Sequence, residues 1–473
     1  MPLPPTDPII ARALDRATGC RPIPGNAVDL LLDGPVTYPA MLDLIGRATR
    51  WIHFENYIIH DDATGWTFAR ALAARARAGV AVRVLADWLG CRGTGARYWR
   101  FLRAAGVEVR LFHPPSWDLF QNFIRDHRKV VVADGLEAIT GGLCIGDEWA
   151  GDPAAARRPW RDTAVRVAGP AVQALDNAFR RTWAVAGGTI PEEERVASAP
   201  ECGTAIVRVI AVEPGQARSY RMLQLLAAGA GTQLWITDAY LVPPPPLHQG
   251  LVDAAHDGTD VRLLVPGASD LPLVRNLTRI GYRDLLRAGV RILEWEGPML
   301  HAKSFVVDGR YARVGSSNLN ASSLLGNYEL DLLIEDREFT VALEAQFRLD
   351  SAESTEVRLR PRRAPERLQE LLPPAFAHEP GPDSGEHPPI PPHRLTARER
   401  RGRAVVALRT VASAARRSLY APAILVLLAV TVLAALLPHV VAWAVGALSL
   451  YLAASAAAEL FRRRSPGSPT DEG

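Results

Sequence analysis

One short pattern occurs twice in this chain, and it constrains the fold more than any other feature. Residues 127–135 read HRKVVVADG and residues 301–309 read HAKSFVVDG, which share the form His-x-Lys-x-x-x-x-Asp-Gly. The motif residues are His127, Lys129, Asp134, His301, Lys303 and Asp308. The chain has 54 lysines and arginines, yet Lys129 and Lys303 are its only lysines. An ammonium group is a compact point charge, whereas a guanidinium group is planar and spreads its charge. Because the chain uses Arg everywhere else, the two lysines indicate that these positions require a point charge.

The sequence that leads to each motif is also repeated. VRVLAD at 82–87 matches VRLLVP at 261–266, and LRAAGVEVRLF at 102–112 matches LLRAGVRILEW at 285–295. These matches indicate an internal duplication of roughly 150 residues, which is too long for a solenoid repeat. We therefore expect two lobes that face each other across a pseudo-two-fold axis.

Each repeat alternates strand-like and helix-like segments. Val80–Leu85 is mostly apolar and rich in β-branched residues, which is typical of a strand buried on both faces. Thr67–Ala78 is rich in Ala and Arg and contains no Gly or Pro, which favours a helix. The pattern predicts an α/β fold in which each lobe is a mostly parallel or mixed sheet covered by helices.

Composition divides the chain into five segments. We expect an N-terminal arm over 1–26, a first lobe over 27–195, a second lobe over 200–350, a linker over 351–405 and a transmembrane hairpin over 419–460. The linker is rich in Pro and Arg and has no apolar periodicity, which is typical of an extended, flexible segment.

The expected hairpin consists of two apolar stretches, 419–437 and 440–458, that contain no Asp, Glu, Lys or Arg. Each has 19 residues, close to the ~20 that a helix needs to span a bilayer. Arginines flank both outer ends, so the positive-inside rule places both ends in the cytoplasm. The alternative is a pair of amphipathic helices packed on the soluble part, but neither stretch has a polar face.

The overall composition argues against several classes of protein. The formal net charge is only +3, which does not by itself indicate nucleic-acid binding. The four cysteines, Cys20, Cys91, Cys144 and Cys202, lack C-x-x-C spacing, so we expect neither a disulfide framework nor a zinc site. The N-terminus has no basic-then-apolar signal pattern, so we expect the lobes to stay on the cytoplasmic side.

The paired motifs suggest a chemistry. A His and a Lys two residues later on a strand point to the same face, so two such strands would gather two imidazoles and two ammonium groups. This set suits a phosphodiester anion and requires no metal or cofactor. One imidazole would attack phosphorus and form a phosphohistidine, while the other protonates the leaving alkoxide and then deprotonates the incoming hydroxyl. The lysines would neutralise the non-bridging oxygens.

The motifs resemble the HKD motifs of the phospholipase D superfamily, and their surroundings resemble its bacterial cardiolipin synthases. The first repeat contains HRKVVVADGLEAITGGLCIGDEW and WRDTAVRVAGPAV. The second contains ITDAYLVP, LLVPGASDLPLVR, MLHAKSFVVDG and GSSNLNASSLLGNYELDLLIED. The resemblance covers about residues 25–350 and leaves out the linker and the hairpin.

The resemblance implies further site residues, because a Ser or Gly, an Asn and an acidic residue follow each motif in the superfamily. The matching residues are Gly142, Cys144 and Asp162 in the first repeat, and Ser316, Asn318 and Glu329 in the second. We expect the two acidic residues to orient the histidines, the alternative being a salt bridge at the end of a strand. We expect Asp134 and Asp308 to brace the turns after the motif strands rather than to touch substrate.

Three features depart from the family pattern. Cys144 stands where the family usually has Asn, and a thiol is a weak hydrogen-bond donor. We therefore expect either that the first half holds phosphate less well or that Asn318 suffices. Residues 320–322 read Asn-Ala-Ser where Asp-Pro-Arg is frequent, which could alter the choice of acceptor. The expected membrane anchor is C-terminal, whereas many relatives have N-terminal helices.

The resemblance implies a cardiolipin synthase, which transfers a phosphatidyl group from one phosphatidylglycerol to a second and releases glycerol. We expect His127 to be the nucleophile and His301 the acid and base, although the near-symmetric site also permits the reverse. A phospholipase D hydrolase or another transphosphatidylase is the main alternative, and a superfamily nuclease or a non-catalytic membrane scaffold is less favoured. The expected partners are phosphatidylglycerol and other phospholipids of a bacterial inner membrane, with no nucleic acid. WDLFQNF at 117–123 is either a membrane-dipping loop or a core-packed one.

Overall fold

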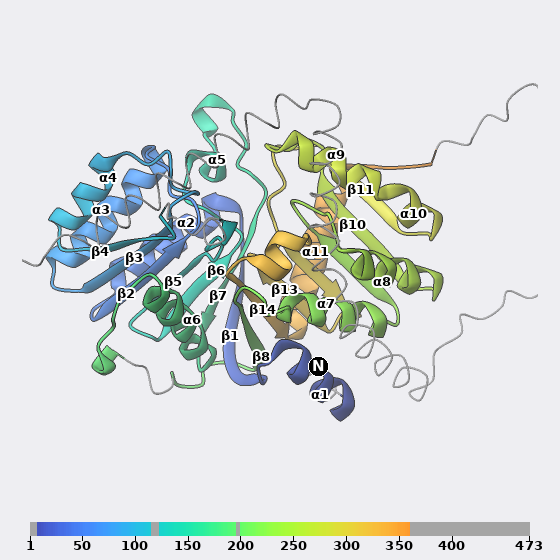
Figure 1. Cartoon of the computed structure of the whole chain (residues 1–473), viewed down its shortest axis with the longest axis horizontal. Helices are drawn as coiled ribbons and strands as arrows, with labels where there is room; N and C mark the ends of the chain where they lie inside the picture. The colour runs from blue at the N-terminus through green and yellow to red at the C-terminus, as the bar shows by residue number, and fades with distance from the viewer. Residues whose placement is uncertain (1–6, 115–122, 195–198, 360–473) are drawn as a thin grey trace, which may run out of the picture.

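A computed structural model describes residues 7–114, 123–194 and 199–359 (Figure 1). Most of the 117–123 loop, nearly all of the expected linker and both apolar stretches lie outside the described residues. Within the described ranges, no helix is both long and apolar enough to cross a membrane. The C-terminal hairpin therefore stays a prediction.

The strands fall into two sets, one for each repeat. The first set is β1 (Ile23–Leu32), β2 (Trp51–Asn56), β3 (Ala81–Asp87), β4 (Glu108–Phe112), β5 (Val130–Ala133), β6 (Glu137–Gly141) and β7 (Thr163–Ala168). The second set is β8 (Ala205–Val212), β9 (Gln233–Thr237), β10 (Asp260–Pro266), β11 (Arg291–Trp295), β12 (Ser304–Val307), β13 (Tyr311–Gly315), β14 (Glu329–Glu335) and β15 (Ser354–Glu356).

Helices cover the strands of both sets. They are α1 (Pro8–Thr18), α2 (Asp33–Arg47), α3 (Ala63–Arg77), α4 (Ala96–Ala104), α5 (Asp147–Ala150), α6 (Ala171–Val185), α7 (Arg218–Gly229), α8 (Pro245–His256), α9 (Pro272–Ile280), α10 (Tyr282–Arg287) and α11 (Arg337–Ala352). Short helical turns lie at Pro153–Ala155, Glu192–Glu194 and Ser322–Gly326.

All these strands join in one sheet of 15, in the order β15-β11-β10-β9-β12-β13-β14-β8-β1-β7-β6-β5-β2-β3-β4. Counted outward from the central β8–β1 pair, the order of the strands is the same in both lobes, and the second lobe adds β15 at its edge. The structural repeat therefore matches the repeat in the sequence. The lobes are joined side by side through the antiparallel pairing of β1 with β8, a continuity that the sequence did not predict.

The sheet is mixed, which confirms the second of the two expected arrangements, and its central part is antiparallel. Parallel pairing is confined to β2-β3-β4 and β9-β10-β11, where helices connect the strands. Each motif strand instead turns back at once, because Asp134 and Gly135, like Asp308 and Gly309, both have positive φ angles. An Asp-Gly pair with positive φ is favourable in a tight hairpin turn, which forces antiparallel pairing.

The ends of the described chain extend the second lobe. The expected N-terminal arm contains α1, whose Ala13, Leu14 and Ala17 are buried in the core of the second lobe against α7. At the other end, α11 and β15 continue past residue 350 into the first residues of the expected linker, and β15 pairs with β11.

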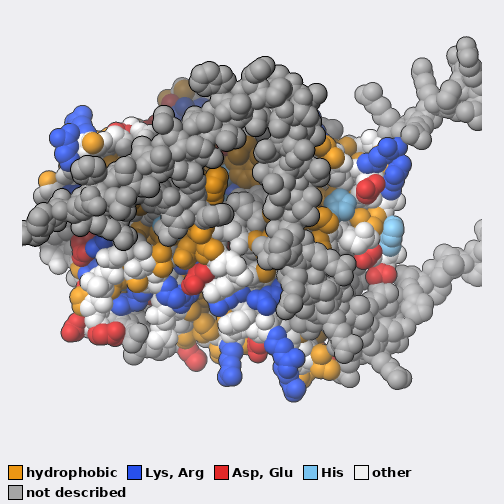
Figure 2. Space-filling view, viewed as in Figure 1, with side chains coloured by type: hydrophobic (Ala, Val, Ile, Leu, Met, Phe, Trp, Pro, Cys, Tyr) orange, Lys and Arg blue, Asp and Glu red, His pale blue; other side chains and the backbone are white. Residues whose placement is uncertain are grey.

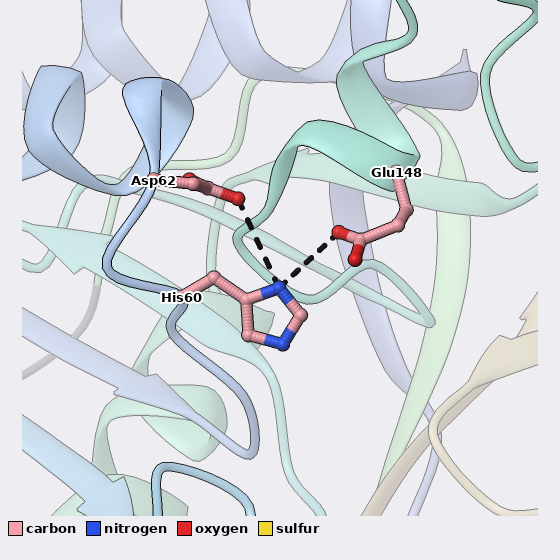
Figure 3. A group of neighbouring side chains, drawn as sticks. All are labelled: His60, Asp62 and Glu148. Atoms are coloured by element: carbon pink, nitrogen blue, oxygen red, sulfur yellow. Dashed lines mark hydrogen bonds and ion pairs between the residues drawn. The ribbon is translucent and has the colours of Figure 1, made fainter. Parts of the chain in front are cut away.

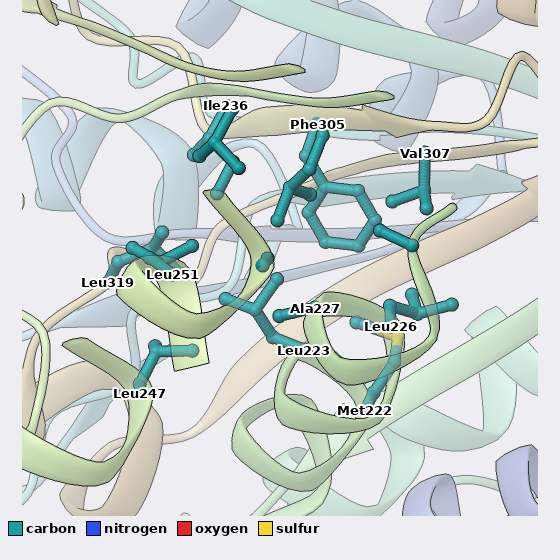
Figure 4. Close-up of a cluster of buried hydrophobic side chains, with 14 of the residues drawn as sticks. Met222, Leu223, Leu226, Ala227, Ile236, Leu247, Leu251, Phe305, Val307 and Leu319 are labelled. Carbon is teal, nitrogen blue, oxygen red and sulfur yellow. The ribbon is translucent and has the colours of Figure 1, made fainter. Parts of the chain in front are cut away.

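Two apolar cores hold the site in place. In the second lobe, Leu223 of α7 and Leu251 of α8 pack with Phe305 of the motif strand β12 (Figure 4). A second core lies between the lobes and buries side chains of both motif strands, including Val132 of β5 and Val306 of β12. The two motifs are therefore fixed relative to each other by packing that both lobes share.

Candidate active site

The first motif histidine lies against the second lobe. The backbone N–H of His127 donates to the carbonyl oxygen of Tyr328 at 2.9 Å. This pairing places the imidazole Nδ1 of His127 3.0 Å from Oε2 of Glu329, which is fully buried. The Ser316 hydroxyl donates to the same carboxylate oxygen at 2.5 Å. Glu329 and Ser316 thus hold His127 in one orientation.

The second motif histidine makes the reciprocal contact with the first lobe. The backbone N–H of His301 donates to the carbonyl oxygen of Arg161 at 2.7 Å. Its Nδ1 lies 2.7 Å from Oδ2 of Asp162. The Trp149 indole donates to that oxygen at 3.1 Å, and the Thr163 N–H donates to the other carboxylate oxygen at 2.8 Å. Each motif histidine therefore takes its carboxylate from the opposite lobe.

The difference between Gly142 and Ser316 follows from the lengths of the two acidic side chains. A Cβ atom added to Gly142 would lie 2.2 Å from Oδ1 of Asp162, so the shorter aspartate leaves no room for a side chain there. In the other half, the hydroxyl of Ser316 bonds to the longer Glu329. The Trp149 indole supplies to Asp162 the side-chain hydrogen bond that Ser316 supplies to Glu329.

The two lysines are buried beside the histidines. The Lys129 ammonium donates to the carbonyl oxygen of His127 at 2.5 Å, and that of Lys303 donates to the carbonyl oxygen of His301. Each ammonium also lies near an aromatic ring, and such a contact stabilises a cation.

These rings belong to two tyrosines that sequence reasoning did not single out. Lys129 Nζ is 5.1 Å from the centre of the Tyr57 ring, and Lys303 Nζ is 5.9 Å from that of Tyr240. Tyr57 and Tyr240 follow the equivalent strands β2 and β9. Each follows the strand that pairs with a motif strand, and this shared setting was the signal that could have identified them.

The residues at the expected Asn positions are both buried. Cys144 is 1% exposed, and burial raises the pKa of its thiol although Lys129 and Lys303 oppose this. The thiol is therefore neutral. Asn318 is 4% exposed, and its Oδ1 has no hydrogen-bond partner within the described residues. The amide oxygen in the second half is thus available to a group that enters the site.

Burial and the local charges decide the protonation of the site. Burial lowers the pKa of His301 to about 3, and Lys303 adds to this while Asp162 opposes it. Burial also lowers the pKa of His127. Although burial acts against it, contact with His127 holds the pKa of Glu329 at about 2. Each carboxylate is thus ionised and accepts the Nδ1 proton of a neutral imidazole, which leaves the Nε2 lone pair of both histidines available.

The motif aspartates lie at the far ends of the motif strands from the histidines. The Asp134 carboxylate accepts hydrogen bonds from the backbone N–H groups of Thr49, Arg50 and Trp51 at 2.8 to 3.0 Å. Asp308 accepts equivalent bonds from residues 231–233 at 2.8 to 2.9 Å. Both carboxylates anchor the start of the neighbouring strand, β2 or β9, and contact neither histidine.

One group within the described residues has an arrangement suited to a metal ion, namely His60, Asp62 and Glu148 (Figure 3). His60 Nδ1 lies 3.2 Å from Glu148 Oε2. Asp62 caps α3 by accepting the Gly65 N–H at 2.8 Å, and it also accepts the Asp147 N–H at 2.7 Å. These contacts account for the three side chains without an ion.

Comparison with known proteins agrees with this geometry. The family described as "Cardiolipin synthase, PLD-like domain" matches residues 41–183 and 223–350, which is more than half of the chain. The chain belongs to this family. It is 34% identical over 351 residues to cardiolipin synthase A of Pseudomonas fluorescens strain Pf-5, covering 73% of both chains. It is 35% identical over 368 residues to cardiolipin synthase A of Pseudomonas aeruginosa strain LESB58, covering 76% of this chain and 74% of that one.

The fold of this chain is also similar to the crystal structure of the phosphatidylserine synthase of Haemophilus influenzae Rd KW20. The TM-score is 0.59 at 15% identity, covering 76% of this chain and 96% of that one. At this identity the likeness concerns the fold alone. The match to the PLD-like family model and the repeated strand order confirm the phospholipase D-like fold that the motifs predicted.

Proposed function

We propose that the protein is a cardiolipin synthase that transfers a phosphatidyl group from one phosphatidylglycerol to another and releases glycerol. The observation that carries the proposal is the reciprocal pairing of the two histidines. His127 bonds to Glu329 and His301 bonds to Asp162, and each keeps Nε2 available. Two ammonium groups beside this pair suit a phosphodiester. Family membership and the names of the relatives support the same conclusion.

In the first step, Nε2 of His127 attacks phosphorus of the donor lipid. A phosphorus–nitrogen bond forms, and the bond from phosphorus to the headgroup oxygen breaks. Nε2 of His301 gives its proton to the leaving alkoxide, which departs as glycerol. The lysines neutralise the charge on the non-bridging oxygens in this step. The reverse assignment of the two histidines satisfies the same balance of bonds and protons.

In the second step, His301 takes a proton from the headgroup hydroxyl of a second phosphatidylglycerol. The resulting oxygen attacks phosphorus, and the phosphorus–nitrogen bond to His127 breaks. His301 must carry a proton in the first step although burial and Lys303 lower its pKa in the free site. The donor phosphate brings a negative charge next to both lysines, and this charge raises the pKa of the imidazole when the lipid binds.

We further propose that the two C-terminal apolar stretches anchor the enzyme in a bacterial membrane with the lobes on the cytoplasmic side. Arg residues flank both outer ends of this region, which supports that orientation. On the face in Figure 2, basic, acidic and apolar side chains are interspersed. The formal net charge is only +3, and nucleic-acid binding needs phosphate-neutralising patches, so a nuclease is the less favoured alternative.

The decisive experiment supplies the purified full-length protein with labelled phosphatidylglycerol and identifies the products. We expect cardiolipin and glycerol in equal amounts. Phosphatidic acid as the lipid product would instead identify a hydrolase. His127→Ala should abolish the activity, and rapid acid-free quenching followed by mass spectrometry should locate the phosphatidyl group on His127. A label on His301 would reverse the assignment, and full activity of His127→Ala would exclude the mechanism.

A further inference from the structure

Exposed apolar side chains occur in both lobes, just before the first motif and in the segment around α9. Within the described residues, Phe123 and Ile280 are the two most exposed large apolar side chains, at 80% and 76%. Leu271 and Leu277, next to and within α9, are 47% and 46% exposed. Single exposed apolar side chains are ordinary, but a group beside a functional site marks an interaction surface.

Specific contacts tie α9 to the catalytic site. The Tyr240 hydroxyl donates to the carboxylate of Asp270 at 2.8 Å, and Asp270 immediately precedes Leu271. The ring of the same tyrosine lies 5.9 Å from Lys303 Nζ and 6.1 Å from the ring of His301. One side chain therefore connects the start of the exposed segment with the reacting groups.

Two further features relate the elements that carry these residues to the catalytic site. Phe123 precedes His127 by four residues. Figure 1 shows α9 on the same upper side as α5 of the first lobe. Trp149 of α5 lies 5.4 Å, ring to ring, from His301. The segment that carries Phe123 thus leads directly into the first motif histidine, and α9 is linked to the second motif histidine through Asp270 and Tyr240.

The same helices carry a row of arginines with a spacing of four residues. They are Arg275, Arg279, Arg283 and Arg287. Arg279 pairs with Glu294 at 2.7 Å, and Arg287 lies 3.6 Å from Asp284. Of the carboxylates that the structure describes, none forms an ion pair with Arg275 or Arg283. Cations beside exposed apolar side chains are typical of helices that lie in the interface of an anionic bilayer.

We propose that these residues form a docking surface for an anionic phospholipid bilayer. The docking surface consists of Phe123, Leu271, Arg275, Leu277, Ile280 and Arg283. It holds the catalytic histidines against the layer of headgroups from which a lipid substrate is drawn, separately from any C-terminal anchor. This inference rests on the proposed function, because a lipid substrate gives the surface its purpose. Its occupant is the bilayer, not a second copy of the chain.

The first test compares two forms of the same substrate with the full-length protein. The double variant Phe123→Ser/Ile280→Asp should lose about tenfold in kcat/KM on phosphatidylglycerol vesicles, because two interfacial apolar contacts are removed. On dispersed short-chain phosphatidylglycerol, below its critical micelle concentration, we expect less than about a twofold change. Equal losses on both forms, or no loss on vesicles, would overturn the proposal.

The matched control is Val341→Asp on α11. Val341 is 51% exposed, which is comparable to Leu277. Strand β14 starts in the catalytic site at Glu329 and ends at Glu335, so α11 begins at the opposite end of that strand. This variant should keep wild-type activity on both forms of the substrate. A loss on vesicles equal to that of the double variant would contradict a local docking surface.

A second readout does not depend on turnover. A dye that reports its environment is attached at Ile280→Cys, in a chain whose exposed Cys202 is replaced by Ser. We expect a blue shift of the dye emission and quenching by brominated lipid in phosphatidylglycerol vesicles, and a weaker response when Arg275 and Arg283 are changed to Glu.

If the dye stays in water, the docking proposal is overturned even if the enzyme is active. A clear response from a protein without synthase activity would instead refute the proposed function alone. A double variant that changes oligomeric state without any dependence on vesicles would assign the surface to a second copy and overturn the proposal.

Discussion

The imidazole of His127 and the carboxylate of Glu329 meet at 3.0 Å although the two residues belong to different lobes. The carboxylate stays ionised and fixes the proton on Nδ1, so Nε2 is presented as a lone pair. His301 and Asp162 repeat the arrangement at 2.7 Å in the opposite direction. Neither motif histidine takes its carboxylate partner from its own lobe.

Glu329→Gln should reduce kcat about a thousandfold without unfolding the protein, because the amide no longer fixes the tautomer of His127. The measurement is turnover of labelled phosphatidylglycerol together with thermal unfolding. Glu335→Gln, at the other end of β14, is the matched control and should retain activity within about twofold. If Glu329→Gln is as active as the control, the carboxylate has no part in catalysis.

Gly142→Ser should reduce activity about a hundredfold or more, because any side chain there displaces Asp162 and with it His301. Ser316→Ala in the other half removes one hydrogen bond to Glu329 and should cost only about tenfold. Steady-state kinetics on the two variants checks this order. Equal losses would mean that the two halves hold their histidines in the same way.

We expect kcat/KM to fall as the pH rises through about 8. Burial lowers the pKa of Lys303 to about 8 in the free enzyme. Below that pH the side chain is a cation that binds the phosphate, and above it the charge is lost. The pH dependence of kcat/KM reports this group in the free enzyme. In the pH profile of kcat, the fall should lie at a higher pH, because bound phosphate stabilises the charged form of Lys303. A profile that stays flat to pH 10 would contradict this account.

Asp134→Ala should destabilise the fold by about 2 to 3 kcal/mol, because several backbone N–H groups lose their acceptor and Ala is strained at a positive φ angle. The folded fraction should keep its kcat, since Asp134 contacts neither histidine. Chemical denaturation and activity at low temperature separate the two effects. Asp29→Ala, an exposed aspartate on β1, serves as the control and should change stability by less than about 0.5 kcal/mol.

The same aspartate gives a dependence of stability on pH. Although burial opposes it, hydrogen bonds from the backbone of residues 49–51 lower the pKa of Asp134 below its usual value. Its contribution to stability is therefore complete above the pKa in the unfolded chain and is lost as the pH falls through the lower pKa in the folded protein. The difference in stability between wild type and Asp134→Ala should shrink accordingly on acidification.

Local patterns in the sequence were enough to predict the duplicated lobes and the motif strands. The buried strands, the Ala- and Arg-rich helix and the two lysines are all properties of short segments, and β3 and β10 lie where the repeats place them. The central antiparallel part of the sheet was less accessible. The Asp-Gly turn was visible, but the pairing of β5 with β6 depends on the dihedral angles of that turn.

The exchange of carboxylates between the lobes could not be predicted from either repeat alone. Asp162 follows His127 in the sequence, but the fold gives it to His301. That pairing depends on the contact between two surfaces, and no local pattern encodes such a contact. Tyr57 and Tyr240 escaped notice for a related reason, because a tyrosine after a strand is ordinary until a buried ammonium group lies beside it.

The exchanged carboxylates also bear on how such a chain could have arisen. A single ancestral repeat could assemble both histidine–carboxylate pairs only by association with a second copy, joined through the strand equivalent to β1 and β8. Fusion into one chain replaces that bimolecular encounter by a high effective concentration of one half for the other. Fusion also allows the two repeats to differ in sequence, since a mutation in one half no longer changes the other. Gly142 and Ser316 are such a difference, because a symmetric dimer of identical chains would have the same residue at both positions.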